Sequence, residues 1–266
     1  MTSSDDADRG RRPLTNLLGA AQFLTRIPIR LRRPPAQPDC VPWFPIVGTF
    51  VGIAVGGVAA GLMEVVPASV AAAVAVLVGV LVTGAFHEDG LADLADSMGG
   101  WTPEQRREIL KDSRHGSYGV AALCGSIVLR IVCVATLGPA VAFAGLVTAH
   151  TLGRSAAVGV MIAGRERSTP MTGRSGLGSD SVHHLRIRSA ATGVIAGLAI
   201  GVLATGWWAI PLALGAAVAA ALVASIALRA LETINGDALG AIEQVGECIV
   251  LVIVTGLAAH HPLWWT

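Results

Sequence analysis

The sequence has 266 residues, of which 53% are hydrophobic and only 14% are charged, with a formal net charge of +1 at pH 7. A soluble protein of this length needs a more highly charged surface, so the composition indicates a membrane protein. It has no basic stripe interleaved with aromatic residues, so we expect no nucleic-acid partner. The four cysteines form no CxxC pair, and we expect neither a disulfide framework nor a zinc site.

We predict an all-α, polytopic helical bundle that forms a single transmembrane catalytic domain over residues 1–266. Residues 1–12 are expected to be a disordered tail. The stretch from Leu14 to Ile29 is broken by Arg26 and Pro28, which favours an interfacial amphipathic helix or a buried element over a full span. About seven stretches then approach the roughly 20 apolar residues that a bilayer requires. They lie at 44–63, 66–86, 117–137, 139–163, 189–206, 208–228 and 246–263.

The positive residues predict the orientation of these spans. With the N-terminus in the cytoplasm, 17 of the 19 lysines and arginines fall on the cytoplasmic side, and the other two, Arg130 and Arg154, fall inside spans. This asymmetry is typical of inner-membrane proteins. The cytoplasmic loops would be 87–116, 164–188 and 229–245, and the ionisable residues that they carry would form one catalytic face.

The densest motif follows the second span, at 87–96. On a helix, Asp89, Asp93 and Asp96 fall within a narrow arc of one face. Three unneutralised carboxylates beside hydrocarbon repel one another, and a hard divalent cation such as Mg²⁺ relieves that repulsion. Glu88 and His87 flank the cluster as a further ligand or a general base. The alternative is a solvated acidic helix start, with Asp89 as an N-cap.

A second motif covers 111–119. Thr102 and Gln105 form the ends of a predicted capping box, so a short helix should run to about Lys111. The glycines, hydroxyls and cations that follow suit a loop whose backbone N–H groups approach phosphate oxygens. An ordinary turn before the next span is the alternative. The candidate phosphate-binding residues are Lys111, Ser113, Arg114, Gly116, Tyr118 and Gly119, and Asp112 is a candidate base or metal ligand.

A third motif, at 235–247, carries Asp237, Glu243 and Glu247. Asp237 must precede the helix to share a face with the two glutamates, and an Asp N-cap with a loop is the alternative reading. Glu247 lies at the start of a span, where an unpaired charge is costly. Arg154 is a candidate for binding phosphate, whereas Arg130 is expected to snorkel or to pair structurally.

The segments 87–100 (HEDGLADLADSMGG), 111–120 (KDSRHGSYGV) and 235–247 (NGDALGAIEQVGE) resemble the cobalamin synthase family, the adenosylcobinamide-GDP ribazoletransferases. The segments 23–29 (FLTRIPI) and 43–56 are similar to the N-terminal region of that family. The resemblance covers nearly the whole chain. Asn235 departs from the threonine that is common in the family at this position.

The resemblance implies an Mg²⁺-dependent enzyme of the bacterial inner membrane that completes adenosylcobalamin. It would join adenosylcobinamide-GDP to α-ribazole, or to its 5′-phosphate, and release GMP. Homo-oligomers and contacts with other cobalamin-assembly enzymes are conceivable partners. The resulting hypothesis has catalytic residues His87, Glu88, Asp89, Asp93 and Asp112; metal ligands Glu88, Asp89, Asp93 and Asp96; and substrate contacts from the second motif, Arg154, Asp237 and Glu243.

Two other functions are alternatives to this one. CDP-alcohol phosphotransferases also carry Asp-rich motifs at helix ends, but their pattern places an arginine soon after the first Asp-Gly, where this chain has Leu-Ala-Asp. A transporter would need polar residues at the midplane of several spans and often has an internal repeat. The sequence shows no convincing repeat.

Overall fold

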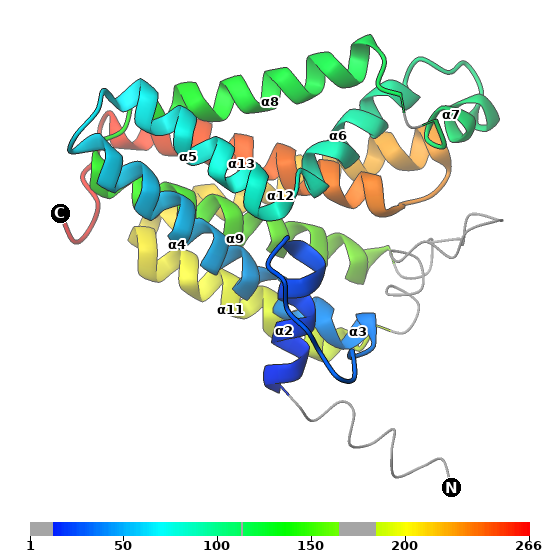
Figure 1. Ribbon diagram of the computed structural model, residues 1–266, viewed down its shortest axis with the longest axis horizontal. Coiled ribbons are helices and arrows are strands. Elements are labelled where there is room, and N and C mark those ends of the chain that lie inside the picture. Colours follow the sequence, from blue (N-terminus) through cyan, green and yellow to red (C-terminus); the bar gives the residue numbers. More distant parts are fainter. Residues whose placement is uncertain (1–12, 113, 165–184) are drawn as a thin grey trace, which may run out of the picture.

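The computed structural model describes residues 13–112, 114–164 and 185–266, and every regular element in these ranges is a helix. The predicted tail at 1–12, Ser113, and most of the predicted loop at 164–188 lie outside the described residues. The all-α prediction is confirmed. The long helices of the described residues run roughly along the long axis of the molecule (Figure 1). They are α4 (Phe44–Met63), α5 (Ala68–Thr83), α8 (Ser117–Ala135), α9 (Pro139–Ala163), α11 (Ile187–Thr205), α12 (Ala209–Leu231) and α13 (Gly236–Ala258).

Shorter helices lie between and beside the long ones. They are α2 (Pro13–Leu24), α3 (Gln37–Cys40), the 3₁₀ turns η1 (Val41–Trp43) and η2 (Gly206–Trp208), α6 (Phe86–Ser97) and α7 (Pro103–Ile109). The predicted N-terminal helix therefore exists but ends at Leu24, five residues before Ile29. Its interfacial position stays a prediction. Figure 1 places α7 at one end of the bundle and the C-terminus at the other.

Five continuous helical stretches in the described residues are long and apolar enough to cross a membrane, and α5 with α6 makes a sixth, bent pair. One of the five, Ile187–Leu231, has 45 residues, or about 68 Å of helix, against a hydrocarbon core of about 30 Å. Gly206, at a φ of +62°, breaks it into α11 and α12. The bundle is thus compatible with about seven spans.

Helix α9 is the centre of the bundle. It packs antiparallel to α4, because Gly48 lies against the backbone of His150 while Gly56 lies against that of Phe143. It also packs antiparallel to α13, since Gly145 faces Val254 and Gly153 faces Glu243. These contacts place the start of α4, the end of α9 and the start of α13 at the same end of the molecule, as the predicted orientation requires.

The second predicted span ends earlier than expected and is followed by a sharp bend. Gly84 and Ala85 adopt left-handed backbone conformations, with φ of +68° and +58°, and α6 leaves α5 at 89°. A left-handed glycine is a common helix terminator. As a consequence, α6 packs against α8 and α13, and His87 and Glu88 of its first turn are buried inside the bundle. The predicted connection at 87–116 therefore begins with a helix that is partly buried, and its cytoplasmic location stays a prediction.

The predicted loop at 229–245 is also much shorter in the structure. Helix α12 continues to Leu231 and α13 begins at Gly236, so only 232–235 connect them. Asn235 caps α13, because its side-chain oxygen accepts a hydrogen bond from the N–H of Ala238. The predicted capping box of α7 is confirmed, since Thr102 and Gln105 exchange side-chain and backbone hydrogen bonds.

Candidate active site

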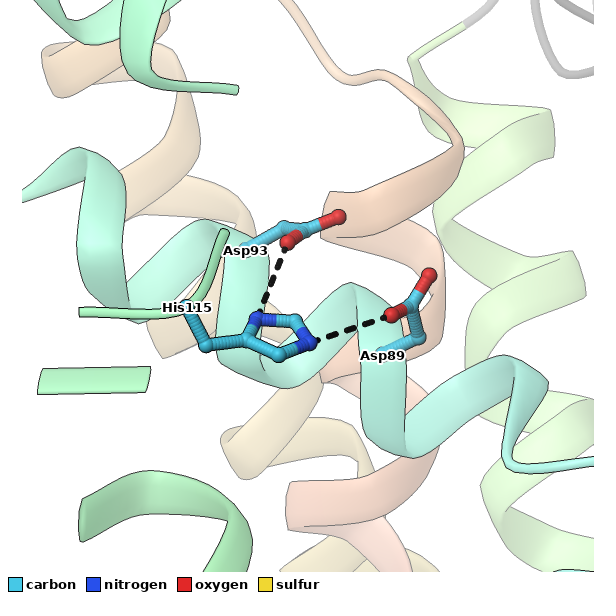
Figure 2. A group of neighbouring side chains, drawn as sticks. All are labelled: Asp89, Asp93 and His115. Carbon is cyan, nitrogen blue, oxygen red and sulfur yellow. Dashed lines mark ion pairs between the residues drawn. The ribbon is translucent and has the colours of Figure 1, made fainter. Parts of the chain in front are cut away.

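Two aspartates of α6 and one histidine of the segment between α7 and α8 form a compact polar group (Figure 2). The imidazole of His115 lies between the carboxylates, with Nε2 at 3.6 Å from Asp89 Oδ1 and Nδ1 at 3.6 Å from Asp93 Oδ1. One ligand atom from each residue lies within 4.8 Å of the other two. Within the described residues, His115 is the only cationic side chain at ion-pair distance from either aspartate. We call these three residues the Asp–His group.

Asp96 lies on the same face of α6, as the spacing predicts, but it contacts backbone rather than the Asp–His group. Its carboxylate accepts hydrogen bonds from the N–H of Gly116, at 2.6 Å, and of Gly119, at 2.8 Å. These N–H groups belong to the start of α8, where a helix leaves its donors unpaired and favours a negative charge. Asp96 therefore fixes the loop that carries His115.

This contact gives Gly116 and Gly119 a role other than the predicted binding of phosphate, because their N–H groups are already engaged by Asp96. A Cβ on Gly119 would collide with that carboxylate. The helix and loop can approach this closely only because the position has no side chain.

The start of α13 lies beside α6. At Gly90 a Cβ would come within 2.9 Å of the carbonyl oxygen of Asp237, so the two backbones touch. The carboxylate of Asp237 accepts a 2.8 Å hydrogen bond from the side chain of Asn235. Asp237 is thus near the Asp–His group and separate from Glu243, which is buried further along α13.

The remaining residues of the 111–119 motif lie on the surface. The carboxylate of Asp112 accepts hydrogen bonds from the guanidinium of Arg114, the shortest at 2.6 Å, and these lower the pKa of Asp112 to about 2. Burial is negligible here, so the hydrogen bonds dominate. Lys111 and Tyr118 are exposed and available to a substrate.

A second set of charges is buried in the middle of the bundle. Arg130 donates to Glu88 at 3.0 Å and to Glu247 at 3.2 Å, while Arg154 pairs with Glu243 and, at 3.0 Å, with Glu247. The buried charge cluster consists of His87, Glu88, Arg130, His150, Arg154, Glu243 and Glu247, each at most 5% exposed.

The cluster changes the interpretation of four candidate site residues. His87, Glu88, Arg154 and Glu243 do not reach the Asp–His group in this structure but bind one another or their cluster neighbours. The expected structural pairing of Arg130 is observed, and its partners are Glu88 and Glu247.

Sequence reasoning missed two partners in particular. His115 was read only as part of a phosphate loop, although it is the one imidazole in that motif. His150 pairs with Glu247, and the signal for it was its position one turn before Arg154 on the same helix face.

Comparison with known proteins now decides the family. The sequence matches the cobalamin-5-phosphate synthase family over residues 16–255. The chain belongs to this family. An adenosylcobinamide-GDP ribazoletransferase of Bradyrhizobium diazoefficiens is 33% identical over 260 residues, covering 91% of this chain and 94% of the relative.

Two further relatives carry the same name. The protein of Shewanella baltica strain OS155 is 34% identical over 80% of this chain and 83% of its own length. That of Shewanella frigidimarina is 32% identical over 81% and 84%, respectively. No solved structure gives a significant match. The resemblance seen in the three sequence motifs is confirmed, and the chain is a transferase of the cobalamin synthase family with a membrane-embedded helical fold.

Proposed function

We propose that this cobalamin synthase transfers the cobinamide-phosphate group of adenosylcobinamide-GDP to α-ribazole or α-ribazole 5′-phosphate and releases GMP. An oxygen of the ribazole forms a bond to the cobinamide-linked phosphorus. The bond from that phosphorus to the bridging oxygen breaks, and GMP leaves with the electron pair. The names of the relatives support the substrates. The observation that carries the proposal for this chain is the Asp–His group at the end of the bundle.

The residues of this group suit a divalent metal. Two carboxylates lie beside each other, with no arginine or lysine of the described residues to neutralise them. Carboxylate oxygens are the donors that Mg²⁺ prefers. We propose Asp89 and Asp93 as its ligands, and leave out Glu88 and Asp96, whose carboxylates are bound to Arg130 and to the start of α8. Bound Mg²⁺ would supply neutralisation of the pyrophosphate charge.

His115 is the candidate general base. Its Nδ1 faces Asp93, and this carboxylate orients the imidazole in the way that a carboxylate orients a catalytic histidine. Its Nε2 faces Asp89 and so points into the group, where it can accept the proton of an attacking hydroxyl. The earlier candidates fit less well, because Glu88 and His87 are buried and Asp112 is held by Arg114.

Exposed cations near this group would hold the substrate phosphates. Lys111 and Arg114 follow α7 in the segment that also carries His115, and the exposed phenol of Tyr118, in the first turn of α8, could donate a hydrogen bond beside them. Arg114 would exchange Asp112 for a phosphate, since a guanidinium binds either anion through paired hydrogen bonds.

We place the protein in the bacterial inner membrane, with the Asp–His group on the cytoplasmic side. The distribution of lysine and arginine supports this orientation. Labelling of single cysteines at Glu108 and Glu64, in a variant without the native cysteines, tests it. A membrane-impermeant reagent on intact cells should react at position 64 alone. Reaction at 108 instead would reverse the orientation.

The transfer itself is tested with purified protein in detergent or liposomes. Adenosylcobinamide-GDP and α-ribazole or its phosphate are mixed with Mg²⁺ or with EDTA, and GMP and corrinoid product are followed together. We expect both products, and only with the metal. If folded protein yields neither product with either ribazole, the proposed reaction is wrong; if it yields both in EDTA, the metal is not required.

A further inference from the structure

Two polar contacts hold α6 against α8, one at the surface and one in the interior, and the aspartates of the Asp–His group lie between them. We call these contacts the outer and the inner tie. At the surface, Asp96 binds the N–H groups of Gly116 and Gly119. In the interior, Glu88 binds Arg130, 14 residues further along α8 than Gly116, at 3.0 Å. Asp89 and Asp93 lie on α6 between these two ties. The position of the aspartates is therefore set by both.

The inner tie depends on one side chain. Arg130 is 3% exposed, and its two terminal nitrogens bind different helices: Nη2 donates to Glu88 on α6 and Nη1 to Glu247 on α13. Its Nε also donates to the carbonyl oxygen of Ser126, at 3.4 Å. A planar guanidinium can hold two carboxylates in a fixed relative position, whereas the point charge of lysine cannot.

The residues around this contact couple the position of Glu88 to that of Asp89 and anchor the other carboxylate that Arg130 binds. Glu88 immediately precedes Asp89, so a rotation or a slide of α6 that moves one carboxylate moves the other. The two carboxylates that Arg130 binds are buried, and Glu247 is held in turn by Arg154 and His150. The fixed end of the tie is thus anchored in α9 as well as α13. Loss of Arg130 would therefore leave Glu88 on α6 without its arginine, whereas Glu247 would keep Arg154 and His150.

We propose that Arg130 is a positioning residue: through Glu88 it holds α6 at the rotation that sets Asp89 and Asp93 for binding a divalent cation. The inference rests on the proposed function of the Asp–His group as a metal site. Arg130 itself contacts none of the three residues of that group.

The test uses the full chain in detergent, without substrates. Wild type, Arg130→Lys, Arg130→Met and the matched control Arg107→Met are titrated with Mn²⁺ and followed by electron paramagnetic resonance. Arg107 pairs with Glu104 and Glu232 at the surface. We expect Arg130→Met to weaken Mn²⁺ binding by at least about tenfold, the range seen when a metal ligand loses its support. The Mn²⁺ affinity of Arg130→Lys should lie between those of wild type and Arg130→Met, and the affinity of Arg107→Met should equal that of wild type.

Hydrogen–deuterium exchange of residues 86–97 gives a second readout that needs no metal. Faster exchange confined to α6 in Arg130→Met supports the proposal. Unchanged exchange together with unchanged Mn²⁺ affinity in the folded variant overturns it. Tighter Mn²⁺ binding also overturns it, because it would mean that Glu88, once released, is itself a ligand. If wild type binds no Mn²⁺, the proposed metal site fails, and exchange in α6 alone decides the role of Arg130.

A variant that keeps the charge balance covers the case in which Arg130→Met does not fold. The double variant Glu88→Gln with Arg130→Met removes one buried charge of each sign. It should fold like wild type yet show weakened Mn²⁺ binding and faster exchange in α6. Recovery of both readouts to wild-type values would show that Arg130 serves only to neutralise Glu88, and would overturn the proposal.

Discussion

Adjacent residues of α6 belong to two charged groups in opposite environments. The side chain of Glu88 is 2% exposed and is bound by a guanidinium, whereas that of Asp89 is 62% exposed and faces only an imidazole. In the interior an unpaired charge is very costly, so each carboxylate there has a cationic partner. At the end of the bundle water lowers that cost. Carboxylates can remain without a strong partner there and are free for a ligand.

This difference in environment separates charges that stabilise the fold from charges that are available for catalysis. The buried charge cluster contains three carboxylates and two guanidinium groups, which bind one another across α6, α8, α9 and α13. A substrate phosphate could reach Arg130 or Arg154 only by breaking these pairs. Substitutions in the two groups should therefore differ in what they change: stability in the cluster, catalysis in the Asp–His group.

The largest effect on activity is expected from the aspartates. Asp89→Asn and Asp93→Asn should each lower transfer by at least about 100-fold, because the amide removes the negative charge that holds the metal. Unfolding midpoints in detergent should stay near wild type. Glu108→Gln, an exposed acid on α7, is the control and should retain full activity. Near-normal turnover of either aspartate variant would contradict the metal assignment.

His115 should affect the chemical step more than metal binding. We expect His115→Gln to lower kcat by about 100-fold, which is typical for loss of a general base, while Mn²⁺ affinity changes little. A rate measured in a single turnover separates the two effects. If the affinity falls as far as the rate, His115 is a ligand rather than the base.

In the buried charge cluster the main effect should be on stability. Arg154→Met leaves Glu243 without its arginine and should lower the free energy of unfolding by about 3–5 kcal/mol. Thermal unfolding in detergent measures it, and the exposed Arg229→Met is the control. Adding Glu243→Gln should recover part of the loss. A stable Arg154→Met protein with lost activity would instead favour the phosphate-binding role predicted from the sequence.

Substitution of Asp96 should affect both stability and activity, because its carboxylate does not touch the substrate but holds the loop that carries His115. Asp96→Asn leaves one acceptor oxygen for two backbone N–H groups that now bind separate carboxylate oxygens, so one hydrogen bond is lost and the other loses its charge, at a cost of about 1–3 kcal/mol. Activity should fall by about tenfold as the His115 loop loosens, with the KM for substrate rising. Loss of activity equal to that of Asp89→Asn would restore Asp96 as a metal ligand.

The smallest effect is expected at Asp112. Its pKa of about 2 makes its carboxylate a poor proton acceptor near neutral pH, so Asp112→Asn should lower kcat by less than about tenfold. Because the pKa of Asp112 is lower in the folded protein, its carboxylate stabilises the fold at pH values above the unfolded-state pKa of about 3.9. This stabilisation is lost only as the pH falls toward 2. Stability profiles of variant and wild type should therefore run parallel from about pH 5 to about pH 8. If Asp112→Asn instead removes a rise in kcat with pH that wild type shows in that range, Asp112 is the general base.

The helical positions of the site were predictable from local rules. Asp89, Asp93 and Asp96 share a face because helical spacing requires it, and the structure places all three toward residues 115–119. The cap of α7 was predicted in the same way. In contrast, the bend at Gly84 and Ala85 was not, since an apolar run that ends in a glycine is equally compatible with a straight span.

Sequence alone thus determined that the chain is a membrane bundle, where most of its spans lie, and which face of α6 carries the aspartates. These properties depend on composition and on residues within a few turns of one another. Only the tertiary structure decided which charges are satisfied. Arg130 meets a carboxylate 42 residues before it and another 117 residues after it, and Arg154 meets one 93 residues away. No local pattern encodes such pairs, because they form only when helix packing brings distant side chains into a medium that cannot hydrate them.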